Sequence, residues 1–188
     1  LVAKREDHGH DDHGKAEHFF RSAYEVRQHT LAEAEKDCSK VDAAAELRKD
    51  LAVSYDALGN LYLTQGSFKK AKETCEDAVS KAKDAVYRST PSACDKTANA
   101  EPKSEPAGTW EQSKLYAAVL DHCGDVYRKM ALEKPKAGEP SELQANLTEA
   151  DKKYEKALQL RQELFKKDGP NVFLADSMLN RASLRRDD

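Results

Sequence analysis

The stretch YDALGNLYLTQGSFKKAKETCEDA, residues 55–78, decides the fold. Its apolar and small residues recur at spacings of three and four, and Gly66 interrupts the pattern near the middle. This pattern predicts two helices that pack on each other across a short turn. Gly59 and Ala71 are small enough to let the two helices approach closely. Gly66 suits the left-handed conformation that commonly ends a helix.

Composition indicates that the rest of the chain is helical as well. Of the 188 residues 35% are charged, whereas Gly and Pro number only 8 and 6. Such a composition is typical of an all-α protein with large solvated faces, and it argues against a β-sandwich or barrel. The net charge of −3 gives no basic surface for nucleic acid, and no apolar run is long enough for membrane insertion.

Periodicity predicts about six helices and no strand, within one domain at residues 15–188. Ser39 and Asp42 form a capping-box pattern ahead of the second helix. Residues 1–14 are rich in His and Asp and are expected to be a disordered tail. A long loop is predicted at 89–108 and a shorter one at 133–140. The six helices are expected at about 15–37, 39–66, 68–88, 109–132, 141–168 and 172–186.

The stretch at residues 55–78 resembles a tetratricopeptide repeat, a helix–turn–helix unit of about 34 residues. The residues that carry this likeness are Tyr55, Leu58, Gly59, Tyr62, Gly66, Phe68, Ala71, Cys75 and Ala78. A second copy, with about 14 extra residues in its turn, is carried by Leu120, Cys123, Gly124, Tyr127, Ala150, Tyr154 and Ala157. The long repeats look most like those of kinesin light chains. The resemblance implies an antiparallel solenoid that binds a protein or peptide without enzymatic activity.

In the family, the first helices of the repeats line a concave groove that binds the partner. The matching positions here are Val53, Asp56, Asn60, Leu63, Thr64, Asp121, Asp125, Arg128 and Lys129. Aspartates stand where chaperone-binding members carry the cations or amides that hold a C-terminal carboxylate. We therefore expect a basic or neutral partner. The alternative is that these positions are ordinary solvated helix faces.

The two end helices suggest a second function. In the repeat pattern the first predicted helix matches a second helix without its first helix, and the last predicted helix matches a first helix without its second. The closing helix of one copy and the opening helix of the next could complete a repeat, so that copies join head to tail into oligomers or filaments. The candidate contact residues are Phe19, Phe20, Tyr24, Val172, Phe173, Leu174, Met178 and Leu179. The alternative is that these helices are polar caps, for which Arg181, Arg185 and Arg186 would be suitable.

The four cysteines leave two pairings open. Cys38 and Cys94 occupy nearly equivalent places after the second helices of adjacent repeats, which predicts a disulfide between them. Cys75 and Cys123 could also meet across the repeat interface. A disulfide and the sequon at Asn146 both favour an extracytoplasmic protein, with a cytoplasmic one as the alternative.

The sequence carries no enzyme motif and implies no cofactor. It has no GxSxG, P-loop, HExxH or GxGxxG pattern, so we expect a protein without enzymatic activity. His8, His10 and His13, with Asp11 and Asp12, are weak candidates for metal binding, because a flexible tail must be ordered to hold an ion.

Overall fold

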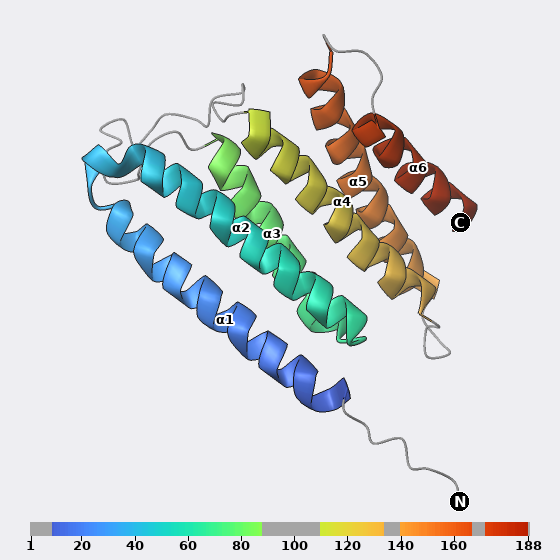
Figure 1. Cartoon of the computed structure of the whole chain (residues 1–188). Coiled ribbons are helices and arrows are strands. Elements are labelled where there is room, and N and C mark those ends of the chain that lie inside the picture. Colours follow the sequence, from blue (N-terminus) through green and yellow to red (C-terminus); the bar gives the residue numbers. More distant parts are fainter. Residues whose placement is uncertain (1–8, 88–109, 134–139, 167–171, 188) are drawn as a thin grey trace, which may run out of the picture.

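The computed structural model describes residues 9–87, 110–133, 140–166 and 172–187, and this part of the chain is all-α (Figure 1). It contains six α-helices, one short 3₁₀ helix and, within the described ranges, no strand. In chain order these are α1 (Gly9–Ala34), η1 (Cys38–Lys40), α2 (Val41–Thr64), α3 (Phe68–Tyr87), α4 (Trp110–Leu132), α5 (Pro140–Leu164) and α6 (Val172–Asp187).

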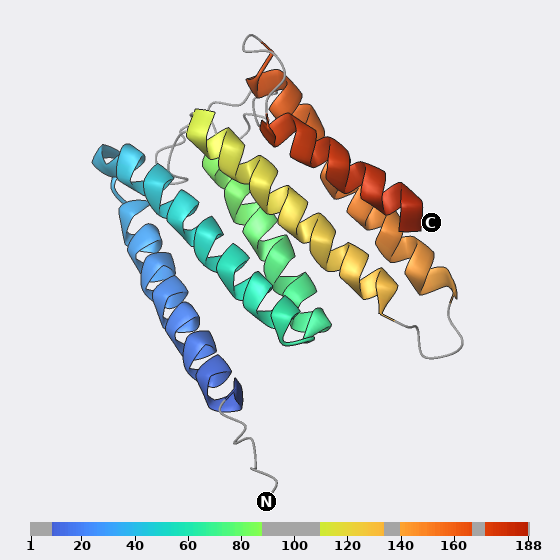
Figure 2. The ribbon, with the colours of Figure 1, turned by 45° about the vertical axis from the view of Figure 1, so that its right-hand side comes forward.

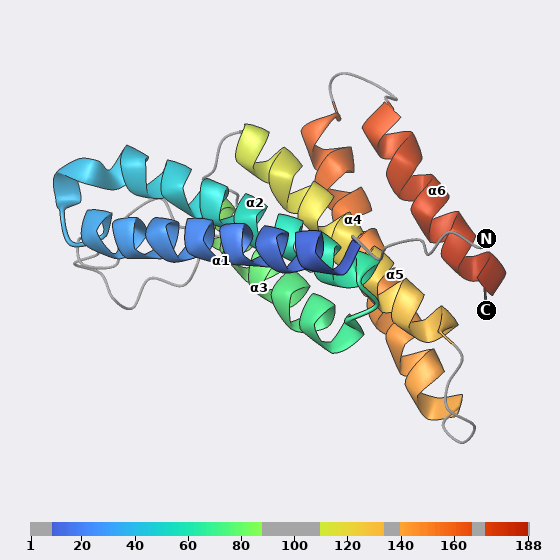
Figure 3. The ribbon, with the colours of Figure 1, turned by 60° about the horizontal axis from the view of Figure 1, so that its bottom comes forward.

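The helices form an array in which each packs on the next one along the chain. In addition, α2 contacts α4, and α4 contacts α6. Figures 1 and 2 show α1 and α6 at opposite ends of this array. Figure 3, seen from below, shows α1 lying along α2. The packing is that of a helical bundle or solenoid, so the all-α prediction is confirmed.

The turn between α2 and α3 confirms the predicted role of Gly66. Its φ of 68° lies in the left-handed region, which L side chains rarely adopt. The Ser67 amide donates to the Tyr62 carbonyl at 2.9 Å, and the Gly66 amide donates to the Leu63 carbonyl at 3.2 Å. These bonds satisfy carbonyls that the end of α2 would otherwise leave without partners.

The core extends between the helices as three apolar clusters. Two of them lie among α2, α3, α4 and α5, and one of these two also includes Leu184 of α6. The third joins α1 to α2 around Leu31 and Leu51. Polar contacts add to the α1–α2 interface. The buried Arg48 donates to Glu35 at 2.8 Å, and the Tyr62 hydroxyl donates to Glu17 at 2.8 Å. One face of α1 is therefore fixed to α2.

Two predicted boundaries differ from the structure. α1 begins at Gly9, six residues before the predicted start. Before α2, Asp37 caps the short η1 helix, because its carboxylate accepts from the Ser39 amide at 3.0 Å. The N-cap of α2 itself is Lys40, which makes no side-chain cap hydrogen bond, so the predicted Ser39 cap is wrong. The predicted long loop at 89–108 lies outside the described residues.

Candidate interaction surfaces

The predicted groove lies on the first helices of the two repeats, α2 and α4. Val53 is about half exposed, and Asn60 is partly exposed. Between the helices, His122 Nδ1 lies 2.8 Å from Asp56 Oδ2. The pKa of His122 is raised, first by this hydrogen bond and then by the charges of Asp56, Asp125 and Asp121. Asp56 therefore holds α4 against α2 and offers little to a partner.

Asp121 is not available to a groove ligand, in contrast to the sequence-based expectation. Its carboxylate is buried and accepts a hydrogen bond from Arg161 on α5, which also donates to Ser177 on α6. Burial raises the pKa of Asp121, and the Arg161 charge opposes that effect. This network joins three helices. Within the described residues, Asp121 Oδ1 and Arg161 Nε have no hydrogen-bond partner.

The remaining groove candidates are also largely engaged. Asp125 accepts a hydrogen bond from the Tyr154 hydroxyl at 2.7 Å, while burial and the Asp125 charge raise the pKa of Tyr154. Leu63 is buried in the core, and Arg128 is partly buried and already in contact with other groups. The groove retains Val53 and Asn60 as its accessible candidates, with the exposed Thr64 and Lys129 at its end.

The outer faces of the end helices are more exposed and more apolar. On α1, Phe19 and Val26 are 70% and 66% exposed. On α6, Val172 and Leu179 are 71% and 63% exposed, and Met178 is about half exposed. Large side chains this exposed are unusual when they share one helix face. We call these two sets the α1 stripe (Phe19 and Val26) and the α6 stripe (Val172, Met178 and Leu179).

Other predicted end residues contribute less to these faces. Tyr24 points inward and contacts the Tyr55 ring, with centroids 5.1 Å apart. Phe173 stacks on Phe165 at 6.0 Å and is only 39% exposed. Phe20 lies at the edge of the exposed surface, and Leu174 is partly buried.

A disulfide joins α3 to α4. It links Cys75 to Cys123 with a Cα–Cα distance of 5.2 Å, well within the usual range. The chain therefore forms one of the two pairings that the sequence analysis left open. Cys94 and the side chain of Cys38 lie outside the described residues, so their predicted disulfide stays a prediction.

No group of three or more His, Cys, Asp or Glu side chains that could bind a metal occurs in the described part of the chain. The side chains of His8, His10 and His13 lie outside it. None of the described helices combines the length and the apolar character needed to span a membrane. No protein-family model matches the sequence, and neither does any curated protein.

Proposed function

We propose that the protein is a non-enzymatic interaction module built on tetratricopeptide-like antiparallel repeats, and that its copies join head to tail. The observation that carries this proposal is the pair of apolar stripes on α1 and α6, which lie at opposite ends of the array (Figure 1). Four stripe residues, Phe19, Val26, Val172 and Leu179, are more exposed than Val53 in the groove. The polar groups of the groove are mostly engaged within the chain.

The two stripes have matching spacing. Phe19 and Val26 are seven residues apart, and so are Val172 and Leu179. Seven residues make about two helical turns, so each pair lies on one face. If α6 of one copy runs antiparallel to α1 of the next, Leu179 lies opposite Phe19 while Val172 lies opposite Val26.

Small residues between the large ones allow the helices to come close. In the same register Ala182 lies opposite Ala16, and Ala175 lies opposite Ala23. The α2–α3 pair shows this type of contact within the chain. There a Cβ on Gly59 would lie 3.7 Å from the Cys75 amide nitrogen and 3.8 Å from the Ala71 carbonyl. The proposed contact repeats that packing between two copies.

The structure gives the alternative of a polar cap less support. Arg181, which a cap would expose, points instead toward α5, where it donates to Asp151 at 2.8 Å and lies 3.4 Å from Glu155. Among the described side chains of α6, Val172, Met178 and Leu179 are large, apolar and exposed. Such a face is suited to burial against another helix.

The contact should be reversible. Burying one large apolar side chain contributes about 1.5–3 kcal/mol. Association costs an estimated 4–15 kcal/mol in lost translational and rotational freedom, so about four such side chains only roughly offset this cost. We therefore expect assembly that depends on concentration.

Light scattering across about 1 μM to 1 mM protein tests the proposal. The wild type should start near the monomer mass of 21.0 kDa and grow with concentration, whereas Phe19→Lys should remain a monomer. Val53→Lys is the matched control, because it places the same charge on an exposed apolar position outside both stripes. A wild type that does not grow, or a control that stops growth equally well, contradicts the proposal.

A second candidate function is peptide binding in the groove, which the exposure of Val53 beside Asn60 favours. Asp56 and Asp125 pair with His122 and Tyr154, so they would act on a peptide only through their negative charge, which suits a basic or neutral peptide. A peptide array probed with the labelled chain tests this function. Capture of basic peptides that Val53→Lys weakens supports it, and preferential capture of acidic C-terminal peptides contradicts it.

A further inference from the structure

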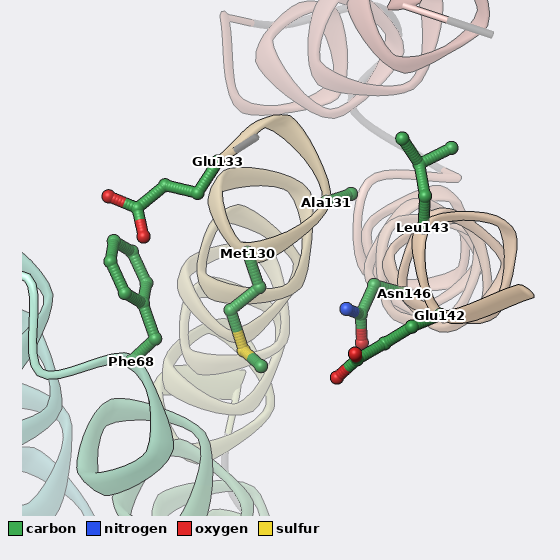
Figure 4. Close-up of a pocket in the computed structure, with 7 residues that line it drawn as sticks. All are labelled: Phe68, Met130, Ala131, Glu133, Glu142, Leu143 and Asn146. Carbon is green, nitrogen blue, oxygen red and sulfur yellow. The ribbon is translucent and has the colours of Figure 1, made fainter. Parts of the chain in front are cut away.

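A cavity of about 190 Å³ lies where α4 ends and where α3 and α5 begin (Figure 4). Phe68, Met130 and Leu143 form its apolar walls, and each comes from a different helix. Binding pockets for drug-sized ligands usually measure about 300–1,000 Å³, so this cavity suits a group no larger than a side chain.

The polar groups of the cavity are not engaged elsewhere in the described structure. Asn146 is only 7% exposed, and its carboxamide points into the cavity without a hydrogen-bond partner among the described residues. The carboxylate of Glu142, one turn earlier on α5, lies beside it (Figure 4). Glu133 adds a second carboxylate at the end of α4. The Asn146 carboxamide offers one carbonyl acceptor and two N–H donors, so it favours a polar ligand.

We propose that this cavity binds a lysine side chain of a partner protein. The aliphatic stem would contact Phe68, Met130 and Leu143, and the ammonium would donate to Asn146 Oδ1 and the Glu142 carboxylate. The C-terminal end of α4, with its negative dipole, also favours a cation.

Lysine fits this site better than arginine. Its ammonium has three rotatable donors that can reach acceptors on separate walls, whereas the guanidinium prefers one carboxylate in a flat, two-bond contact. The site is independent of the proposed head-to-tail contact, because neither apolar stripe contributes a residue to it.

The two methionines of the chain give separate readouts. Met130 lines the cavity, whereas Met178 belongs to the α6 stripe. In the full chain labelled with ¹³C at the methionine methyls, we expect the blocked peptide Gly-Gly-Lys-Gly-Gly to shift the Met130 signal in a saturable way and to leave Met178 unchanged. The same peptide with norleucine, which keeps the stem but lacks the ammonium, should bind at least about tenfold more weakly.

Matched variants on α5 test the role of charge. Glu142→Gln should weaken the lysine peptide about fivefold, whereas Glu149→Gln should not, because Glu149 lies two turns further along and pairs with Lys152 at 2.6 Å. Unchanged circular dichroism shows that both variants fold. Equal binding of the two peptides, a shift confined to Met178, or full affinity in Glu142→Gln would each overturn the proposal.

Discussion

The α2–α3 and α4–α5 pairs carry the same small residue at the same place but pack differently around it. A Cβ on Gly59 would meet the Cys75 backbone at 3.7 Å, an ordinary contact. A Cβ on Gly124 would lie 2.6 Å from the ring of the buried Tyr154. Cys75 and Tyr154 occupy equivalent positions by sequence spacing. In the first pair the small Cys75 side chain leaves room for the next helix. A large residue in the second pair fills that room.

The equivalent aspartates differ in the same way. Asp56 on α2 pairs with His122 on the partly exposed face. Asp121 on α4 lies in the buried network with Arg161 and Ser177. Two aspartates at positions that are equivalent by sequence spacing therefore serve different roles. One aspartate joins the first helices at the surface, and the other fixes α5 and α6 in the interior.

The largest expected effect comes from breaking the buried pair. Asp121→Ala should lower the free energy of unfolding by about 3–5 kcal/mol, because it leaves the Arg161 charge buried without a partner. Asp56→Ala should cost less than about 1 kcal/mol, since its pair is partly exposed. Urea unfolding monitored by circular dichroism measures both. Equal losses would show that the two aspartates are not distinguished by burial.

The disulfide that joins the two pairs should contribute the next largest effect. Replacing Cys75 and Cys123 together with alanine opens a loop whose ends are 48 residues apart, and it should cost about 2–4 kcal/mol. The same unfolding experiment under non-reducing conditions measures the loss. Alkylation of the unfolded, unreduced wild type provides the control. Modification of both Cys75 and Cys123 would contradict the disulfide.

Alanine at each glycine tests the packing difference directly. Gly124→Ala should cost about 1–3 kcal/mol, because the buried Tyr154 ring has no free space to move into. Gly59→Ala should be neutral or stabilise by up to about 1 kcal/mol, since its contacts are ordinary and alanine favours a helix. Thermal unfolding of both variants compares them. A loss at Gly59 as large as that at Gly124 would remove the contrast.

The smallest effect is a dependence on pH. The Asp56 carboxylate raises the pKa of His122 in the folded state, so the pair stabilises the protein fully below the unfolded pKa. This contribution is lost as pH rises through the folded pKa. Between about pH 6 and pH 8, the stability difference between wild type and His122→Gln should shrink by a few tenths of a kcal/mol. A difference that grows with pH contradicts the pairing.

The sequence predicted the helices and the Gly66 turn because both depend on local spacing. It also placed Cys75 and Cys123 at core positions of the predicted repeats, where a disulfide between them was one of two possibilities. The other, Cys38–Cys94, stays a prediction. Spacing alone does not show how closely two helices approach, and that distance decides the pairing.

The buried network and the cavity could not be predicted in the same way. Asp121 and Arg161 are 40 residues apart, and which charge turns inward depends on how α4 and α5 rotate against each other. Asn146 was recognised only as part of a sequon. Its burial in the cavity follows from the meeting of three helices that are far apart in the sequence.

The head-to-tail contact is tested most directly by mixing two variants, Phe19→Lys and Leu179→Lys, each of which has lost one stripe. Alone, each should stay near 21.0 kDa at concentrations where the wild type grows. A 1:1 mixture retains one intact α6 stripe and one intact α1 stripe, so sedimentation should show a dimer of about twice that mass and nothing larger. A mixture that remains monomeric, while the wild type assembles, would contradict the account.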